Sequence, residues 1–232
     1  MIFKKQYNYL NKKDIRKLSC LFCFDGTSLL SLAFSNLPLP IQQHSIKVGS
    51  LSGLMAKFIP ENRLPYGMKR DEFADAVRYG AQYHDIAAYL VYNMYERYPS
   101  SGERFLREQT EESIMGPLFR RVALETVKYS CERYDGAGYP DGVSGDNIPI
   151  HASICAVANT VDDYMASAHH ILNKKIINEA QKYITENKEI IFSSPAVECF
   201  TSSIAGIIYL YKLWRRNPPK TTVCNVKNDY IN

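Results

Sequence analysis

The sequence lacks the marks of several protein classes. Its first 17 residues are polar with scattered apolar side chains, so they do not read as a secretory signal peptide. The longest apolar run, residues 203–214, contains a lysine and is too short to cross a bilayer. The net charge of +4 is not concentrated in one segment of the sequence, so it does not indicate nucleic-acid binding. We expect a cytoplasmic protein with no membrane span and no nucleic-acid partner.

Cysteine does not indicate a disulfide scaffold either. Without a signal peptide, the 6 cysteines are expected to be reduced thiols. Cys20 and Cys23 form a C-x-x-C, but no second pair follows at zinc-finger spacing. A structural zinc and buried small side chains are both open there, and the second is the simpler interpretation.

Internal repeats are absent and alternating polar/apolar runs are few, whereas apolar residues recur at helical spacing along most of the chain. We therefore predict an all-α helical bundle in one domain. The expected helices cover residues 22–37, 44–58, 71–95, 103 or 111 to 131, 152–166, 172–185 and 195–214. We divide the chain into an N-terminal helical extension (1–40), the main domain (41–214) and a flexible tail (215–232), whose composition is poor in apolar residues.

Polar residues that can bind a metal lie on the expected inward faces of the helices. His44 opens one apolar stripe, and His84 lies within another and is followed by Asp85. Imidazole and carboxylate ligands from separate helices can hold Fe, Mn or Zn inside a bundle. The alternative is a buried His/Asp hydrogen-bonded pair that stabilises two helices.

The stretch "ERYDGAGYPDGVSGDNIP", residues 132–149, is a glycine- and proline-rich turn between helical segments. Glycines at 136, 138 and 142 permit positive φ and close backbone approach. The guanidinium of Arg133 could bind a phosphate and the ring of Tyr139 could stack on a base, so the turn could contact a substrate or a partner. Equally, it could serve as a rigid crossover between helices. The candidate loop residues are Arg133, Asp135, Gly138, Tyr139 and Pro140.

Together, His44, the His84–Asp85 pair, this turn and "AVANTVDD" resemble an HD-GYP domain, over residues 44–166 and more loosely beyond. The resemblance implies a helical bundle that holds two or three metal ions, commonly iron or manganese. It also implies hydrolysis of cyclic di-GMP to pGpG, and in some members to GMP. His44, His84 and Asp85 match metal-ligand positions of the family.

Several other family positions differ. The Lys of H-D-x-x-K is Ala88, and no histidine lies between 84 and 151. A His-His pair is replaced by Ser130 and Cys131, and a metal-binding Asp by Asn159. Neutral hydroxyl and amide groups do not neutralise a cluster of divalent ions.

These differences predict a degenerate member of the family that lacks its hydrolysis. One divalent ion (Fe, Mn or Zn) would remain at His44, His84 and Asp85, with Asn159 or Asp162 as a weak fourth ligand. Asp162 could equally be a surface or capping acid. We expect a regulatory or binding module in cyclic dinucleotide signalling, with a cyclic dinucleotide or a signalling protein as partner. The alternative is a single-metal phosphohydrolase that cleaves a phosphoester or cyclic di-GMP.

Overall fold

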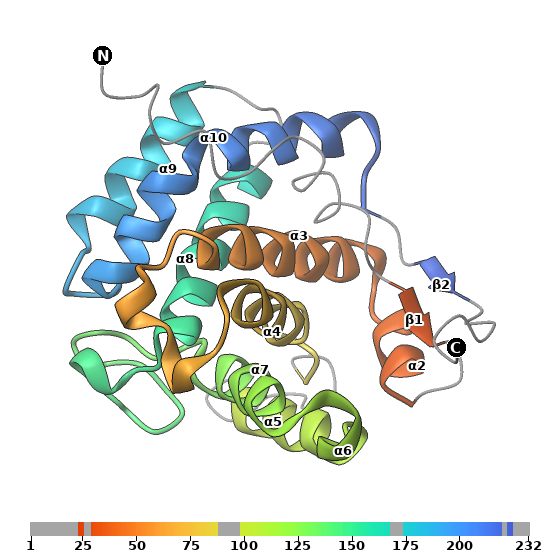
Figure 1. The fold of residues 1–232 in the computed structure, drawn as a ribbon. Helices are drawn as coiled ribbons and strands as arrows, with labels where there is room; N and C mark the ends of the chain where they lie inside the picture. Colours follow the sequence, from red (N-terminus) through yellow and green to blue (C-terminus); the bar gives the residue numbers. More distant parts are fainter. Residues whose placement is uncertain (1–22, 26–28, 88–97, 168–173, 220–221, 225–232) are drawn as a thin grey trace.

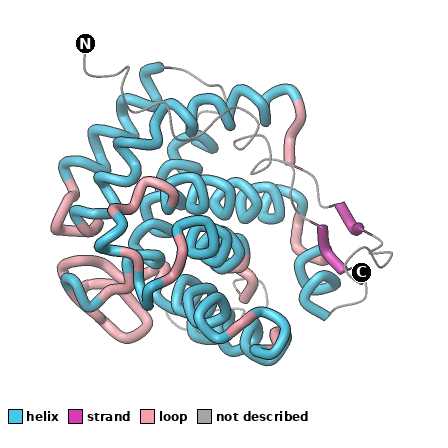
Figure 2. Tube along the Cα trace, in the orientation of Figure 1, coloured by secondary structure: helices cyan, strands magenta, loops and turns pink. Residues whose placement is uncertain are grey.

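The computed structural model describes residues 23–25, 29–87, 98–167, 174–219 and 222–224. The regular secondary structure of these residues is helical, except for two strands of three residues each that pair in parallel (Figures 1 and 2). The all-α prediction is confirmed. The extension and the tail predicted at the two ends lie largely outside the described residues, and the proposed division of the chain stays a prediction.

The elements follow one another along the chain with short connections. The α-helices are α2 (Leu29–Ser35), α3 (Leu39–Ala56), α4 (Arg70–Gln82), α5 (Tyr98–Gln109), α6 (Glu112–Met115), α7 (Pro117–Tyr129), α8 (Ile150–Ser167), α9 (Lys174–Glu186) and α10 (Ser194–Arg216). The strands are β1 (Cys23–Asp25) and β2 (Thr222–Cys224). Three 3-10 turns span Glu61–Arg63, Pro65–Gly67 and Gly145–Asn147.

Prolines set the start of several helices. α3, α7 and α10 each carry a proline in the first two positions, where the missing N–H costs no helical hydrogen bond. Gly116, with φ of 78°, reverses the chain just before α7. The segment predicted as one long helix ending at residue 131 is divided into α5, α6 and α7, and Gly116 with Pro117 makes the break between α6 and α7.

The core surrounds α3, which runs through the middle of the molecule and packs on α4, α8 and α10 (Figure 1). Val48, Leu51 and Met55 on this helix are fully buried. α7 lies on the other side of α4, and the two backbones approach closely at Gly80. A Cβ at that position would lie 2.5 Å from the carbonyl oxygen of Ala123, so only glycine allows this packing.

A helix predicted to run from residue 71 to 95 ends earlier, at Gln82. In a continued helix the carbonyl of Ala81 would accept from the N–H of Asp85. It accepts instead from the backbone N–H of His84 at 3.4 Å and from the His84 ring at 2.7 Å. His84 and Asp85 consequently lie in a turn after α4 rather than in mid-helix.

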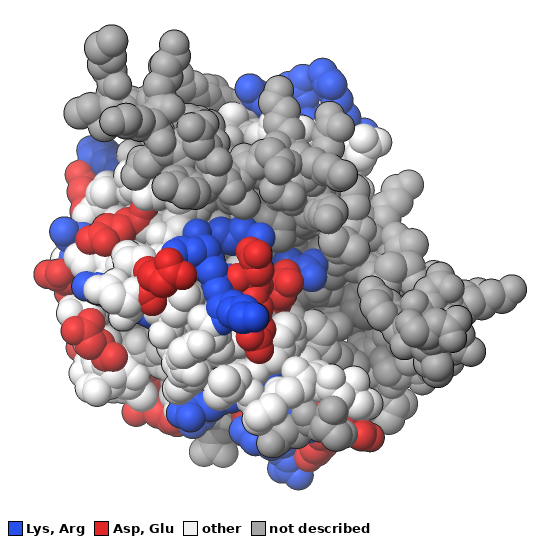
Figure 3. Space-filling view, viewed as in Figure 1, with Lys and Arg blue, Asp and Glu red and all other residues white. Residues whose placement is uncertain are grey.

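Two further observations concern the surface. Among the described helices, none has the length and apolarity needed to span a bilayer. On the face drawn in Figure 3, acidic and basic side chains of the described residues are interspersed. This mixing agrees with a small net charge that is not concentrated in one block.

Candidate metal centre

His84 is held in one tautomer. Its ring Nδ1–H donates to the carbonyl of Ala81 at 2.7 Å, which leaves the lone pair of the neutral ring on Nε2. The side chain is buried, and Nε2 makes no hydrogen bond with any described residue. Nε2 lies 3.4 Å from Oδ2 of Asp85. A histidine fixed by a backbone carbonyl, with its other nitrogen left open, is the usual arrangement of a metal ligand.

His44 reaches the same carboxylate from α3. Its Nε2 lies 3.7 Å from Oδ2 of Asp85, and its Nδ1–H donates to Oδ2 of Asp162 at 2.9 Å. The centroids of the His44 and His84 rings are 5.4 Å apart. The Asp162 carboxylate thus fixes the His44 ring so that Nε2 faces Asp85 and His84.

The three side chains form a group that can hold one ion. One ligand atom from each of His44, His84 and Asp85 lies within 4.8 Å of the others. The three side chains lie as close together as predicted, and Nε2 of His84 is buried without a hydrogen bond to a described residue. Whether the group holds a metal or is a buried His/Asp pair stays a prediction. Two imidazoles and one carboxylate suit Fe, Mn or Zn.

Asp162 supports His44 from behind. Its Oδ2 accepts from His44, and its Oδ1 accepts from the hydroxyl of Tyr211 at 2.6 Å. Nζ of Lys47 lies 3.8 Å from the same Oδ1. The carboxylate is buried, so it is neither a surface acid nor a helix cap. It lies on the Nδ1 side of His44, away from the nitrogen that faces Asp85, and therefore orients the His44 ring.

The charges around Asp162 follow from these contacts. Burial alone would raise its pKa, but the hydrogen bond from His44 and the charge of Lys47 hold that pKa below its usual value. Burial would lower the pKa of His44, yet Asp162 and Asp85 together raise it. The pKa of Lys47 is lowered by burial, which outweighs the attraction of Asp162. His44 and Asp162 are therefore joined by a hydrogen bond that the neighbouring charges strengthen.

Sequence reasoning missed Lys47 and Tyr211. Lys47 follows His44 by three residues on α3, so helical spacing could have indicated it. Tyr211 lies 49 residues after Asp162 on α10, and no local pattern indicates that contact.

The positions expected to form the second half of a family metal site are occupied differently. Ser130 is buried, and its hydroxyl donates to the carbonyl of Val127 at 3.0 Å. The thiol of Cys131 shares a hydrogen bond with the hydroxyl of Tyr98 at 3.0 Å. Burial raises the pKa of that thiol, so it stays protonated near neutrality. Neither side chain belongs to the three-residue group.

Asn159 lies on α8, three residues before Asp162. Its Oδ1 is buried and makes no hydrogen bond with any described residue. No contact places it against His44 or His84, so its role as a ligand stays a prediction. Glu111, a nearby acid that could have replaced the missing histidine, is exposed and outside the group.

The glycine-rich loop is internally bonded. Arg133 binds the Asp135 carboxylate with both Nε (3.0 Å) and a terminal nitrogen (2.6 Å), and Asp135 also accepts from the N–H of Ala137. These donors lower the pKa of Asp135 to about 2. Backbone N–H groups of residues 134 and 135 donate to the carbonyls of Ile191 and Ile190. These contacts favour the rigid-crossover interpretation, with packing on the turn before α10 rather than on α8.

Gly138 and Tyr139 lie at the tightest part of this loop. A Cβ at Gly138 would lie 2.3 Å from the backbone nitrogen of Arg133. The Tyr139 ring packs edge-on against Tyr98, with centroids 6.1 Å apart, and the peptide bond to Pro140 is cis. Burial raises the pKa of Tyr139 to about 12, so its hydroxyl remains a neutral donor next to Cys131.

A family model described as an HD domain matches residues 85–191, from Asp85 through the loop and α8 into the turn after α9. This match supports the family resemblance over the matched residues. His44 and His84 lie outside the matched range, and the geometry alone brings them to Asp85.

Two curated proteins are similar in sequence. A cyclic di-GMP phosphodiesterase of Thermotoga maritima is 24% identical over 206 residues, covering 82% of this chain and 52% of that protein. The cyclic di-GMP phosphodiesterase response regulator RpfG of Xanthomonas campestris pv. campestris is 39% identical over 107 residues, covering 46% of this chain and 26% of that protein. The chain thus spans about half the length of the first relative and about a quarter of the second.

Proposed function

We propose that this chain is a degenerate HD-GYP domain that binds one divalent metal ion and serves as a binding or regulatory module in cyclic dinucleotide signalling. The names of the two relatives supply the ligand class, cyclic di-GMP. The observation that carries the proposal is the three-residue group. Its two histidines are fixed with open Nε2 atoms beside Asp85, whereas Ser130 and Cys131 are engaged in other hydrogen bonds.

His44, His84 and Asp85 would hold the ion, and Asp162 would keep the His44 ring in place. A bound divalent ion supplies Lewis acidity toward a phosphate oxygen. In-line cleavage of a phosphodiester by this kind of chemistry relies on a second ion to stabilise the leaving oxygen. Ser130, as a neutral donor to Val127, and Cys131, as a protonated thiol, are poor ligands for that ion. We therefore expect binding without hydrolysis at the family's rate.

The test combines metal analysis, ligand binding and product analysis on purified protein loaded with iron, manganese or zinc. We expect about one ion per chain, binding of cyclic di-GMP in an equilibrium assay, and neither pGpG nor GMP by chromatography. A His84→Ala, Asp85→Ala variant should lose the ion. Arg104→Gln, an exposed change on α5, is the matched control and should keep it.

Two ions per chain, or robust pGpG formation that the double variant abolishes, would refute the inactive reading. The alternative function, a single-metal phosphohydrolase, is favoured by the same open three-ligand group. It predicts slow turnover of an activated aryl phosphate that requires one ion and disappears in the double variant.

A further inference from the structure

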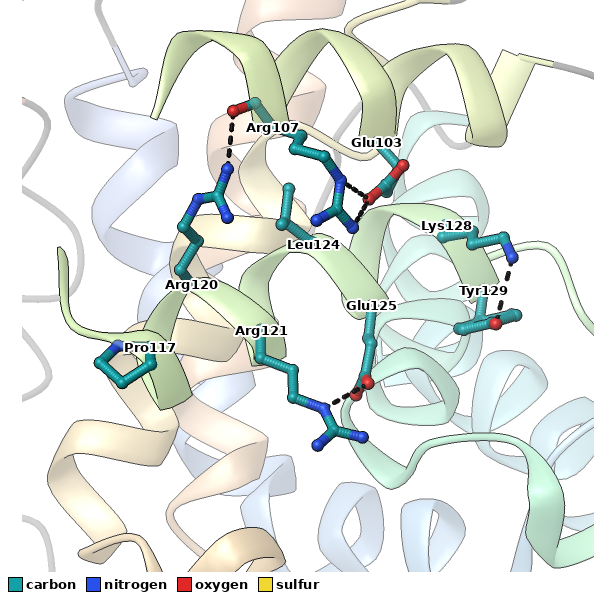
Figure 4. Close-up of a pocket in the computed structure, with 9 residues that line it drawn as sticks. All are labelled: Glu103, Arg107, Pro117, Arg120, Arg121, Leu124, Glu125, Lys128 and Tyr129. Carbon is teal, nitrogen blue, oxygen red and sulfur yellow. Dashed lines mark hydrogen bonds and ion pairs between the residues drawn. The ribbon is translucent and has the colours of Figure 1, made fainter. Parts of the chain in front are cut away.

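A second feature of the molecule is a cavity of about 510 Å³ formed by α5 and α7 (Figure 4). None of the three candidate metal ligands lines it. Its charged lining consists of Glu103, Arg107, Arg120, Arg121, Glu125 and Lys128. These six side chains carry four positive and two negative formal charges, so the lining has a positive balance.

The two ion pairs of this cavity are asymmetric. Arg107 pairs with Glu103, and the exposed fractions of the two side chains are 55% and 14%. Arg121 pairs with Glu125, with exposed fractions of 56% and 21%. In both pairs the guanidinium is the more exposed partner; Figure 4 shows Arg107 between α5 and α7, and Arg121 on the other side of the α7 ribbon. An approaching ion therefore meets positive charge first.

The carboxylate of Glu125 is drawn inward by further donors. Tyr66 donates its hydroxyl to Oε2 at 2.9 Å, and His151 donates from Nε2 to the same oxygen at 3.0 Å. Burial would raise the pKa of Glu125, but His151 and Arg121 bring it to about 2. Glu125 can thus stay ionised and bonded when Arg121 turns toward another anion.

The walls are tied to each other. Arg120 on α7 donates to the carbonyl of Arg107 at 2.8 Å and to that of Thr110 at 3.2 Å, at the end of α5. This bridge fixes the two helices and hence the width of the cavity. A cavity that is formed before its ligand arrives avoids part of the cost of ordering.

We propose that this cavity binds a small phosphate-bearing anion at a site separate from the metal group. The planar guanidinium of an arginine matches phosphate oxygens. Lys128 also lines the cavity, and its ammonium pairs with Asp141. The guanidiniums of Arg107 and Arg121 are each more than half exposed, so they can turn from a carboxylate toward a phosphate that enters the cavity.

The size of the cavity favours a small molecule over a macromolecule. About 510 Å³ lies within the common range of small-ligand sites. An extended polyanion would need a continuous track of positive charge, whereas acidic and basic side chains are mixed on the face drawn in Figure 3. Because the cavity shares no lining residue with the metal group, this proposal does not depend on the proposed function.

The test is a calorimetric titration of the metal-free full chain with pyrophosphate, and separately with inorganic phosphate and poly-glutamate. We expect saturable binding of pyrophosphate that weakens with added salt. The variant Arg107→Gln, Arg121→Gln should raise Kd about tenfold or more, because each lost guanidinium removes charge-assisted hydrogen bonds. Glu103→Gln removes an acid and should lower Kd.

Arg104→Gln is the matched control, since Arg104 forms the same i,i+4 pair with Glu108 on α5 but does not line the cavity. It should leave Kd within about twofold. Circular dichroism confirms that each variant is folded. No saturable binding by the wild type, an equal loss in Arg104→Gln, no change in the double arginine variant or in Glu103→Gln, or tighter binding of poly-glutamate than of pyrophosphate would each overturn the proposal.

Discussion

Among the described residues, two histidines are hydrogen-bonded to a carboxylate, and they differ in what surrounds the second ring nitrogen. His44 bonds Asp162 through Nδ1, and its Nε2 faces Asp85 and the ring of His84. His151 bonds Glu125 through Nε2, and its Nδ1 is buried beside the ring of Phe73 without a hydrogen bond to a described residue. A histidine–carboxylate pair is thus a candidate ligand only where other ligands converge.

The environments also move the two histidines in opposite directions. Two nearby carboxylates outweigh the burial of His44 and raise its pKa. Burial dominates at His151 and lowers its pKa, although Glu125 opposes the change. The His44–Asp162 pair lies beside Asp85 in the three-residue group, and the His151–Glu125 pair joins α7 to α8 inside the fold.

The largest expected effect separates the two pairs by metal affinity. His84→Ala removes a buried, open nitrogen from the three-residue group, so affinity for the divalent ion should fall by more than about 100-fold. Glu125→Gln alters the other pair and should leave metal content unchanged. Elemental analysis after dialysis against a metal buffer measures both, and equal losses would show that the change acts through folding.

A smaller effect is expected behind His44. Asp162→Asn removes the charge that fixes the ring while leaving an oxygen that can still accept from Nδ1. We expect metal affinity to fall by roughly 10- to 100-fold, as is typical when a residue that hydrogen-bonds to a metal ligand is changed. The stoichiometry of one ion should stay unchanged. Competition with a chromophoric chelator gives the affinity. An unchanged value would mean that Asp162 only stabilises the helices.

Stability, rather than metal affinity, should respond at the second pair. Glu125→Ala leaves His151 and Tyr66 without their shared acceptor, so the free energy of unfolding should fall by about 1–2 kcal/mol. Glu108→Ala, which removes an exposed partner of Arg104, should change it by less than about 0.5 kcal/mol. Urea denaturation measures both, and similar small values would contradict the structural role.

The smallest effect is the pH dependence of that difference. The pKa of Glu125 is lowered from 4.5 to about 2, so its contribution is complete above pH 4.5 and is lost as the pH falls toward 2. His151 has a pKa below 6.5, so protonation of the unfolded chain also reduces stability below pH 6.5. The gap in unfolding free energy between wild type and Glu125→Ala should therefore be widest near neutrality and narrow in acid.

The sequence predicted the helices well where apolar spacing and proline agreed, as for α3, α8 and α10. It also predicted that His44, His84 and Asp85 would meet. It did not predict that α4 ends at Gln82, because a side-chain hydrogen bond from His84 to Ala81 decides that end. A bond of this kind depends on the ring orientation and leaves no periodic trace.

The support behind the site was harder to predict. Asp162 was placed on the correct helix face, but its partners are 118 residues before it (His44) and 49 residues after it (Tyr211). Such contacts arise from the packing of α3, α8 and α10, which a single sequence does not specify. Helical spacing indicated the candidate ligands, whereas tertiary packing determines how their side chains are oriented.

The hydroxyl of Tyr211 has a consequence for the order in which the protein is made. His44, His84 and Asp85 are synthesised early. Asp162, which orients His44, accepts a hydrogen bond from Tyr211 on α10, and that helix is synthesised much later. A nascent chain emerges N-terminal end first. A chain that stops before residue 211 therefore contains the three candidate ligands but lacks the hydrogen bond from Tyr211 to Asp162. We expect ribosome-bound intermediates to bind a divalent ion more weakly than the released protein.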